Sequence, residues 1–486
     1  MSTKTVWQRW ARRLGFVVFA GALIGFLVWF NLFRTQRVAA ERSLEDEFLY
    51  GSMGSEVEEG TPYWIWVILP KVFPEYLPGP GGYASIGLAW NEGHDLPVGV
   101  TRRTIGFERV GVNCAFCHVS QVRLEREDPK PRYYYGGPGH QVRVQDYQDF
   151  LFNCASDPRF NADTLMHEIG GVTKLSEREA LLYRHVLIPL TKRALLRQRD
   201  EFAWQKQHGR PLHGPGRIDP FNPVRFRIFK QPDDESIGNS DMPSIWNLKA
   251  RAGQSLHWDG LTKVFNETLI SSAIGDGARN AGLDVEYLQK VANYLADLPA
   301  PSYPLPVDRE LAARGATLYQ SECADCHAFG GSRTGKLQPL SEIGTDPHRT
   351  RAWTQGQVDD WKRLASEYAE KYNAKWNLDS FNKHEGYVSQ PLDGVWLRGP
   401  YLHNGSVPSL RALLEPAESR PQVFYRGNDL LDRENVGFVS TDATAGSRSF
   451  FRYDTRLPGN SNSGHLYGVQ LSVEDKRALV EYMKTL

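Results

Sequence analysis

Residues 323–327 read Cys323-Ala-Asp-Cys326-His327, and residues 114–118 read Cys114-Ala-Phe-Cys117-His118. In this pattern two thiols add covalently to a haem, and the adjoining imidazole binds its iron. Thioredoxin-like pairs and zinc sites use the same cysteine spacing, but neither requires a histidine directly after the second cysteine. The sequence therefore predicts two covalently bound haems c. The attachment sites are Cys114, Cys117, Cys323 and Cys326, and the proximal iron ligands are His118 and His327.

The chain has 486 residues, which is enough for two or three domains with a sizeable core. It carries 57 basic and 57 acidic residues, so no global field marks a nucleic-acid partner, and we expect none. Four of its five cysteines belong to the two motifs. The remaining Cys154 has no partner for a disulfide and is expected to be a small buried residue.

An uncharged stretch, residues 14–33, follows a basic flank made of Lys4, Arg9, Arg12 and Arg13. This length and flank are typical of one membrane-spanning helix. A cleaved signal peptide is the alternative, because Val38-Ala39-Ala40 has the small residues of a cleavage site. Either interpretation sends the rest of the chain across the membrane. We therefore expect a single-pass inner-membrane protein with a cytoplasmic tail at residues 1–13 and its body in the periplasm, where c-type haem is attached.

Composition divides the rest of the chain into three parts. Residues 41–60 are polar and acidic with Gly and Ser, so 34–60 are expected to form a tether. Residues 61–300 are predicted to form an N-terminal haem domain with an insertion at 119–239. Pro299 and Pro301 follow a predicted helix and mark the boundary to a C-terminal cytochrome c domain, residues 301–486.

The second motif lies in a small-cytochrome pattern. An amphipathic helix is expected over residues 308–320, and Ser472 with Asp475 three residues later predicts a capped last helix. A crossing of these two helices closes a class-I cytochrome c fold. The predicted fold class is therefore mainly α: two class-I cytochrome c-like haem domains with loop-rich insertions, after a single N-terminal transmembrane helix.

The second haem needs a ligand on the face opposite His327. A methionine is disfavoured, because the one methionine after this motif is Met483, three residues from the C-terminus. Histidine remains, and an imidazole in place of a thioether lowers the reduction potential, as suits an electron store or relay. The alternatives are His348, His384, His403 and His465.

Near the first haem, the candidate ligands are His94, His140 and the run Tyr133-Tyr134-Tyr135. A single histidine in such a place is more often hydrogen-bonded or on the surface than bound to iron. We therefore expect the first iron to be five-coordinate or water-bound. An open iron of this kind binds a small oxidant, dioxygen or peroxide.

Two further stretches resemble motifs of the bacterial di-haem cytochrome c peroxidases. Ser240-Asp-Met-Pro-Ser-Ile-Trp-Asn247, followed by His257-Trp258-Asp259-Gly260, is similar to the segment that ends in their Phe-Trp-Asp-Gly-Arg motif. Arg398-Gly-Pro-Tyr-Leu-His403-Asn-Gly-Ser406 is similar to their Pro-Tyr-Phe-His-Asp-Gly motif. The resemblance covers roughly Val110 to the C-terminus and reaches a superfamily that includes MauG and the rubber oxygenases. It implies that Trp258 relays electrons between two haems, and that calcium sits between the domains in some relatives.

The chain departs from those peroxidases at three positions. Tyr134 stands near the place of their reversible histidine ligand, Ala278 at the place of their catalytic glutamate, and Ala417 at the place of their methionine ligand. Glu267 comes too early to replace the glutamate. The nearest carboxylate is Asp276, which is therefore the candidate acid or base.

The ending Gly459-Asn-Ser-Asn-Ser-Gly-His465 looks more like the rubber-oxygenase-like, or RoxA-like, branch. In that branch both axial ligands of the second haem are histidines, the distal one lies near the C-terminus, and the first haem binds dioxygen. The resemblance therefore points to His465 as the sixth ligand of the second haem, with His403 as the second choice.

The leading hypothesis is a haem oxidoreductase that binds dioxygen or peroxide at the N-terminal haem and exchanges electrons with the C-terminal haem. Its substrate is an organic molecule or a protein side chain, and a redox protein partner is compatible with this role. One alternative is a hydrogen peroxide-reducing cytochrome c peroxidase in which Asp276 replaces the glutamate. The other is a non-catalytic electron carrier, which requires both irons to be six-coordinate.

Overall fold

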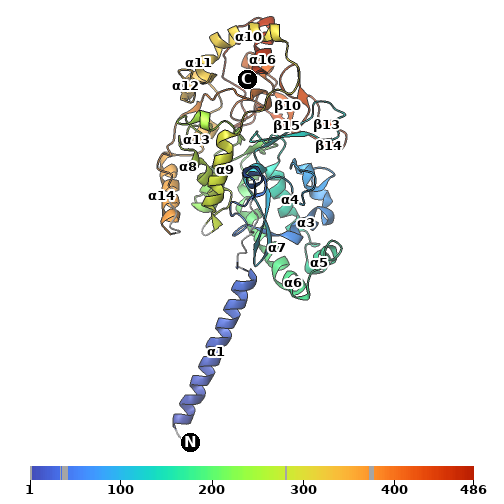
Figure 1. Cartoon of the computed structure of the whole chain (residues 1–486), viewed down its shortest axis with the longest axis vertical. Helices are drawn as coiled ribbons and strands as arrows, with labels where there is room; N and C mark the ends of the chain where they lie inside the picture. Colours follow the sequence, from blue (N-terminus) through green and yellow to red (C-terminus); the bar gives the residue numbers. More distant parts are fainter. Residues whose placement is uncertain (1–2, 33, 35–41, 280–281, 372–376) are drawn as a thin grey trace.

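The computed structural model describes residues 3–32, 34, 42–279, 282–371 and 377–486. Figure 1 shows the N-terminal helix α1 projecting from a folded body, with α10 and α16 at the far end of that body. The helices are α1 Thr3–Leu32, α2 Leu44–Tyr50, α3 Tyr63–Val72, α4 Val144–Ser156, α5 Ala162–Gly170, α6 Glu177–Leu182, α7 Ile188–Glu201, α8 Phe265–Gly275, α9 Val285–Asp297, α10 Arg309–Glu322, α11 Ala324–His327, α12 Leu340–Ile343, α13 His348–Arg351, α14 Gln355–Lys371, α15 Leu410–Leu413 and α16 Val473–Met483.

The strands are short and form small antiparallel sheets. The largest sheet that the described residues form has three strands in the order β1-β3-β2, and the others are two-stranded. The strands are β1 Thr61–Pro62, β2 Val100–Ile105, β3 Phe107–Val112, β4 Val119–Val122, β5 Arg132–Tyr135, β6 Arg217–Ile218, β7 Ser240–Asp241, β8 Leu337–Pro339, β9 Gly386–Val388, β10 Val423–Arg426, β11 Leu431–Asp432, β12 Gly437–Phe438, β13 Thr444–Ala445, β14 Arg448–Ser449 and β15 Phe451–Asp454. Since 43% of the structure is helical, the predicted mainly α class is corrected to helices combined with short strands.

The predicted transmembrane anchor at residues 14–33 is wrong. A span needs about 20 consecutive apolar residues. Within the described ranges, no helix is both long enough and apolar enough to cross a membrane. This finding also overturns the single-pass inner-membrane localisation.

The predicted tether is folded over part of its length. The Ser43 hydroxyl caps α2 by accepting a hydrogen bond from the Asp46 N–H at 3.0 Å. Phe48 of α2 is fully buried and stacks on Tyr294 of α9, with ring centroids 5.3 Å apart. Residues 35–41 of the tether lie outside the described residues. The folded body therefore begins at about residue 43 rather than at residue 61.

The insertion at 119–239 supplies helices α4 to α7, which pack with α3 around one core. Trp66 of α3, Phe150 and Cys154 of α4, and Leu165 of α5 are all buried in it. The interpretation of Cys154 as a buried small residue is confirmed. Much of this insertion is therefore packing for the N-terminal region.

The helices around the second motif cross as predicted. Asp308 caps α10 by accepting a hydrogen bond from Leu311 N at 3.0 Å, and Ser472 caps α16 by accepting one from Asp475 N at 3.1 Å. At the crossing, a Cβ atom on Gly315 would lie 2.0 Å from the Ala478 carbonyl oxygen. Only glycine permits this approach of two backbones. The tight crossing fixes the end of α10, from which α11 carries the second motif.

Buried ion pairs join the chain before residue 300 to the chain after it. Asp241 of β7 accepts a hydrogen bond from Arg426 of β10 at 2.7 Å, and Asp259 accepts one from Arg349 of α13 at 2.9 Å. These four residues are at most 9% exposed. Removing one partner of a buried pair leaves an uncompensated charge, which is strongly destabilising. The parts of the chain before and after residue 300 therefore form one interlocked body.

Candidate functional site

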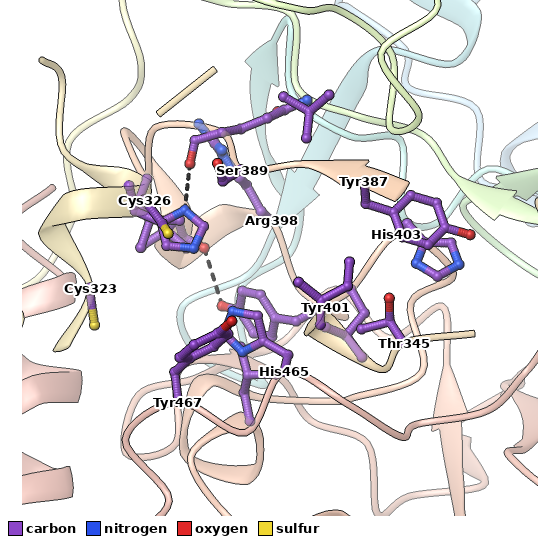
Figure 2. A pocket seen from close by; sticks show the side chains of 18 of the residues that line it. Cys323, Cys326, Thr345, Tyr387, Ser389, Arg398, Tyr401, His403, His465 and Tyr467 are labelled. Carbon is purple, nitrogen blue, oxygen red and sulfur yellow. Dashed lines mark hydrogen bonds between the residues drawn. The ribbon is translucent and has the colours of Figure 1, made fainter. Parts of the chain in front are cut away.

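A cavity of about 350 Å³ lies at the second motif. Cys323, Cys326, His327 and His465 line it. Figure 2 shows the two cysteines on one side of this cavity and His403, with its neighbours, on the opposite side. Much of the cavity lining is apolar: Val388, Leu392, Val395, Leu410, Leu413, Leu414 and Met483.

His327 is held in one orientation by a backbone carbonyl. Its Nδ1 donates a hydrogen bond to the Gln390 carbonyl oxygen at 2.7 Å. Because a carbonyl only accepts, Nδ1 carries the proton and Nε2 keeps its lone pair. A hydrogen bond from the ring nitrogen that does not bind the metal orients metal-binding imidazoles and fixes their tautomer. His327 is therefore prepared to bind a metal through Nε2.

The imidazole of His465 faces that of His327 across the cavity, with ring centroids 6.1 Å apart and ring planes 47° apart. Its backbone is pinned, since His465 N donates to the Ile343 carbonyl oxygen at 2.7 Å. Burial, followed by the positive charges of neighbouring groups, lowers the pKa of His465 to about 3. The ring is therefore neutral and its lone pair is available.

The second site fits a haem c. A metal–imidazole bond is about 2 Å long, and two imidazoles on opposite faces of one ion then have centroids about 6 Å apart, close to the observed 6.1 Å. Two thiols on the same cavity would supply the covalent attachment, and apolar walls suit a porphyrin. Cys323, Cys326, His327 and His465 are thus the residues that would hold the group.

The other histidines considered for this ligand lie elsewhere. His403 lines the cavity, but its ring lies flat against Tyr387, with centroids 3.8 Å apart. His348 Nδ1 is within 2.9 Å of the Asp346 carboxylate, and His384 is exposed. The geometry favours His465 over these three, and its role as the iron ligand stays a prediction.

The first motif is held by its flanking residues. Asn113 Oδ1 accepts a hydrogen bond from Ala115 N at 2.9 Å, and Asn113 Nδ2 donates to the Gly51 carbonyl oxygen at 2.8 Å. His118 Nδ1 donates to the Pro243 carbonyl oxygen at 3.0 Å. Burial lowers the pKa of His118 to about 4. His118 and His327 are therefore each oriented by a hydrogen bond from Nδ1 to a backbone carbonyl oxygen.

The residues proposed near the first iron are engaged in other contacts. His140 has Nδ1 3.1 Å from the Pro138 carbonyl oxygen and Nε2 3.2 Å from the Gln121 carbonyl oxygen. His94 is exposed and stacks on Tyr50, with centroids 4.3 Å apart. In the tyrosine run, Tyr135 accepts a hydrogen bond from Asn91, Tyr133 contacts Trp90, and Tyr134 packs edge-on against Trp396. None of these contacts directs a ring nitrogen or hydroxyl toward His118.

Trp258 lies at the second cavity and is tied to the segment that holds His118. Its indole Nε1 donates to the Asp241 carbonyl oxygen at 2.7 Å. Asp241, Met242 and Pro243 all line the second cavity, and the Pro243 carbonyl accepts the hydrogen bond from His118. One short backbone segment therefore touches both motif sites, with Trp258 beside it. No sequence signal marks Pro243 or Gln390, because their contribution is a backbone carbonyl.

Asp276 follows α8 and lies close enough to the first motif for its charge to act on the Cys114 and Cys117 thiols. Although its side chain keeps solvent access, the surrounding protein desolvates the carboxyl. This desolvation, together with repulsion from Glu59, raises the pKa of Asp276 to about 7. Glu267, in contrast, is buried and accepts hydrogen bonds from Thr262 Oγ1 at 2.7 Å and Ser380 N at 3.1 Å. Asp276 is the better placed of the two carboxylates for proton transfer.

One segment of the chain matches a known protein family. Residues 386–425 match the family described as RoxA-like, cytochrome c-like. This segment contains Gln390, which orients His327, and His403. A RoxA-like cytochrome c segment implies covalently bound haem c and a haem-containing oxidoreductase.

Two relatives come from Sinorhizobium fredii. The chain is 31% identical over 305 residues to the uncharacterized protein y4iM, which covers 54% of this chain and 69% of the relative. It is 29% identical over 364 residues to the uncharacterized protein y4iJ, which covers 56% of this chain and 60% of that relative. The chain belongs to the family of y4iM.

Proposed function

We propose that this protein is a di-haem c-type oxidoreductase with unequal haem sites. The N-terminal haem, at Cys114, Cys117 and His118, takes a small oxidant, dioxygen or peroxide. The C-terminal haem, at Cys323, Cys326 and His327, stores or relays electrons. The molecule oxidised is an organic compound or a protein side chain. Haem supplies one-electron transfer and oxygen or peroxide chemistry, and the protein controls which ligands and partners reach it.

The difference between the two proximal histidines carries this proposal. His327 faces a second imidazole, His465, at a separation that suits two ligands on one iron. Beside His118, the nitrogens of His140 are occupied by carbonyl oxygens and His94 is stacked on Tyr50. A closed iron transfers electrons, whereas an open iron can also bind an oxidant. The motif resemblance to the di-haem peroxidase and MauG superfamily supports the same division of roles.

Electron paramagnetic resonance of the isolated protein tests the proposal. We expect one high-spin signal that changes on adding cyanide, beside one low-spin signal that does not, and two haems per chain by pyridine haemochromogen assay. The reduced protein should react with dioxygen or peroxide at the high-spin centre. Two low-spin signals that ignore cyanide, dioxygen and peroxide would instead favour an electron carrier.

A second candidate function, peroxide reduction, is favoured by Asp276. Because its pKa is raised to about 7, the carboxylate form needed by a general base is lost as the pH falls below 7. If Asp276 is that base, the rate of reaction with hydrogen peroxide rises with pH through about 7. Asp276→Asn should then remove this pH dependence and slow the reaction by about 10²–10⁴-fold. Stopped-flow mixing with peroxide over this pH range measures both effects.

Asp297→Asn is the matched control, because Asp297 is an exposed carboxylate that pairs with Lys249 at the surface. It should leave the rate and its pH profile unchanged. A peroxide reaction that Asp276→Asn does not alter would exclude Asp276 as the base and weaken the peroxidase alternative.

A further inference from the structure

His465 ends a loop, residues 459–465, whose Gly, Ser and Asn residues would leave a free chain flexible. Its own backbone has a φ of 50°, in the left-handed region that costs a non-glycine residue free energy. The ring Nδ1 of His465 is buried and has no hydrogen-bond partner in the part of the chain that the structure describes. His327 and His118 are oriented by ring hydrogen bonds. The position of His465 depends chiefly on what holds its backbone.

The buried guanidinium of Arg420 holds this backbone. Arg420 is 2% exposed and donates five hydrogen bonds, as many as its five N–H groups can give. All five acceptors are backbone carbonyl oxygens. Three belong to the end of the loop: Asn462 at 2.6 Å, Gly464 at 2.8 Å and His465 at 3.2 Å. The other two lie at the end of α15 and just after it: Leu413 at 3.1 Å and Glu415 at 3.0 Å.

Other buried side chains hold the beginning of the same loop. Asn404 Nδ2 donates to the carbonyl oxygens of Gly459 at 3.2 Å and Ser461 at 3.0 Å. The Asp346 carboxylate accepts a hydrogen bond from Ser461 N at 3.2 Å. Asn404 and Asp346 are at most 3% exposed. Among the described side chains, Arg420 is therefore the one that holds the end of the loop nearest the ligand.

The contacts of Arg420 fit one arrangement of the loop. A buried charge is costly unless its hydrogen bonds are satisfied, and here carbonyl oxygens from two segments of the chain satisfy it together. The loop also packs closely on residues 343–345, since a Cβ atom on Gly464 would lie 2.3 Å from the carbonyl carbon of Gly344. If the loop moved, Arg420 would lose three acceptors at once. The loop and the guanidinium therefore fix each other.

We propose that Arg420 is a positioning residue that keeps His465 on the second iron and so closes this haem to added ligands such as cyanide, dioxygen and peroxide. The inference rests on the proposed function, in which the two irons differ in their access to an oxidant. An imidazole on a mobile loop exchanges with other ligands. A preorganised imidazole keeps its place, because little conformational entropy is lost when it rebinds. Arg420 thereby directs the oxidant to the first haem.

The test is a cyanide titration of the full-length holoprotein, followed by electron paramagnetic resonance. In the wild type, cyanide should leave the low-spin signal of the second haem unchanged. In Arg420→Gln, part of this haem should become high-spin and should bind cyanide at least about tenfold more tightly, because losing even one hydrogen bond to a charged group changes an equilibrium by that factor. Added imidazole should restore the low-spin signal of the variant, since it replaces the displaced ring of His465.

Arg210→Gln is the matched control. Arg210 is also buried and also donates to backbone carbonyl oxygens, those of Trp204 at 2.9 Å and Ser236 at 3.0 Å, but these bonds hold no part of the 459–465 loop. It should leave both signals and the cyanide titration unchanged. The proposal is overturned if Arg420→Gln and Arg210→Gln give the same spectra and the same titration. It is also overturned if Arg420→Gln loses the low-spin signal and imidazole does not restore it, because the site is then disrupted rather than opened.

Should Arg420→Gln fail to fold, carbon monoxide binding to the reduced wild type replaces the variant. A second haem that does not bind carbon monoxide supports the inference, and binding there overturns it, because His465 would then leave the iron although Arg420 is present. A wild type that lacks the low-spin signal would contradict the proposed function and this inference together. A normal low-spin signal in the wild type, with an unresponsive Arg420→Gln variant, would overturn the inference alone.

Discussion

His465→Ala is expected to abolish the low-spin signal of the second haem completely and to replace it with a high-spin signal. The reason is geometric, since His465 is the imidazole that faces His327 at 6.1 Å. Without it, that face of the iron has no imidazole. His465→Met should instead keep a six-coordinate iron and raise its reduction potential, because a thioether ligand favours the ferrous state. Electron paramagnetic resonance and redox titration measure the two effects.

His403→Ala and His348→Ala are the controls for this experiment. His403 lines the same cavity but lies flat against Tyr387, and His348 is bound to Asp346. Both variants should retain the low-spin signal. Loss of that signal in His403→Ala, with its retention in His465→Ala, would reverse the assignment of the sixth ligand.

The second site could be predicted from the sequence to a large extent, because its chemistry is encoded at short range. Covalent attachment needs Cys323, Cys326 and His327 at fixed spacing. The helices α10 and α16 beside them begin at Asp308 and Ser472, which can be recognised as capping residues in the sequence. The facing histidine depended on a resemblance, since 138 residues separate His465 from His327. Only the fold brings these two rings together.

The features that the sequence did not reveal depend on backbone atoms or on long-range burial. Pro243 and Gln390 act through their carbonyl oxygens, which any residue possesses. Arg217 stands in a Gly- and Pro-rich stretch that reads as a surface loop, yet the structure buries it completely. The predicted tether contains α2 because Phe48 packs against α9. In each case tertiary contacts overrode what local composition indicated.

The backbone segment from Asp241 to Pro243 gives the two sites a shared physical basis. It pairs with Arg217, accepts the Trp258 indole N–H, lines the second cavity and orients His118. A change in charge at one site therefore acts on groups that the other site also contacts. The segment from Asp241 to Pro243 is therefore a backbone contact that the two motif sites share.

Cys323→Ala combined with Cys326→Ala is expected to remove one of two haems and to unfold the region after residue 301. The walls of the cavity would then enclose about 350 Å³ without the group that fills it. The apolar side chains that line this cavity would then face water instead of packing against a partner, which destabilises the region around them. The pyridine haemochromogen assay should give half the wild-type haem content. Limited proteolysis should cut first within residues 301–486.

Cys154→Ala is the matched control, because Cys154 is fully buried but belongs to neither motif. It should keep the full haem content and lose only the stability of one small buried side chain. Cys114→Ala with Cys117→Ala should also halve the haem content, while leaving the low-spin signal of the second site intact. If the Cys323 and Cys326 double variant kept its haem content, the second motif would not attach haem, and the di-haem proposal would fail. If it lost haem but stayed folded, the cavity must collapse or fill with water, and the helix crossing at Gly315 would be sufficient to hold the region together.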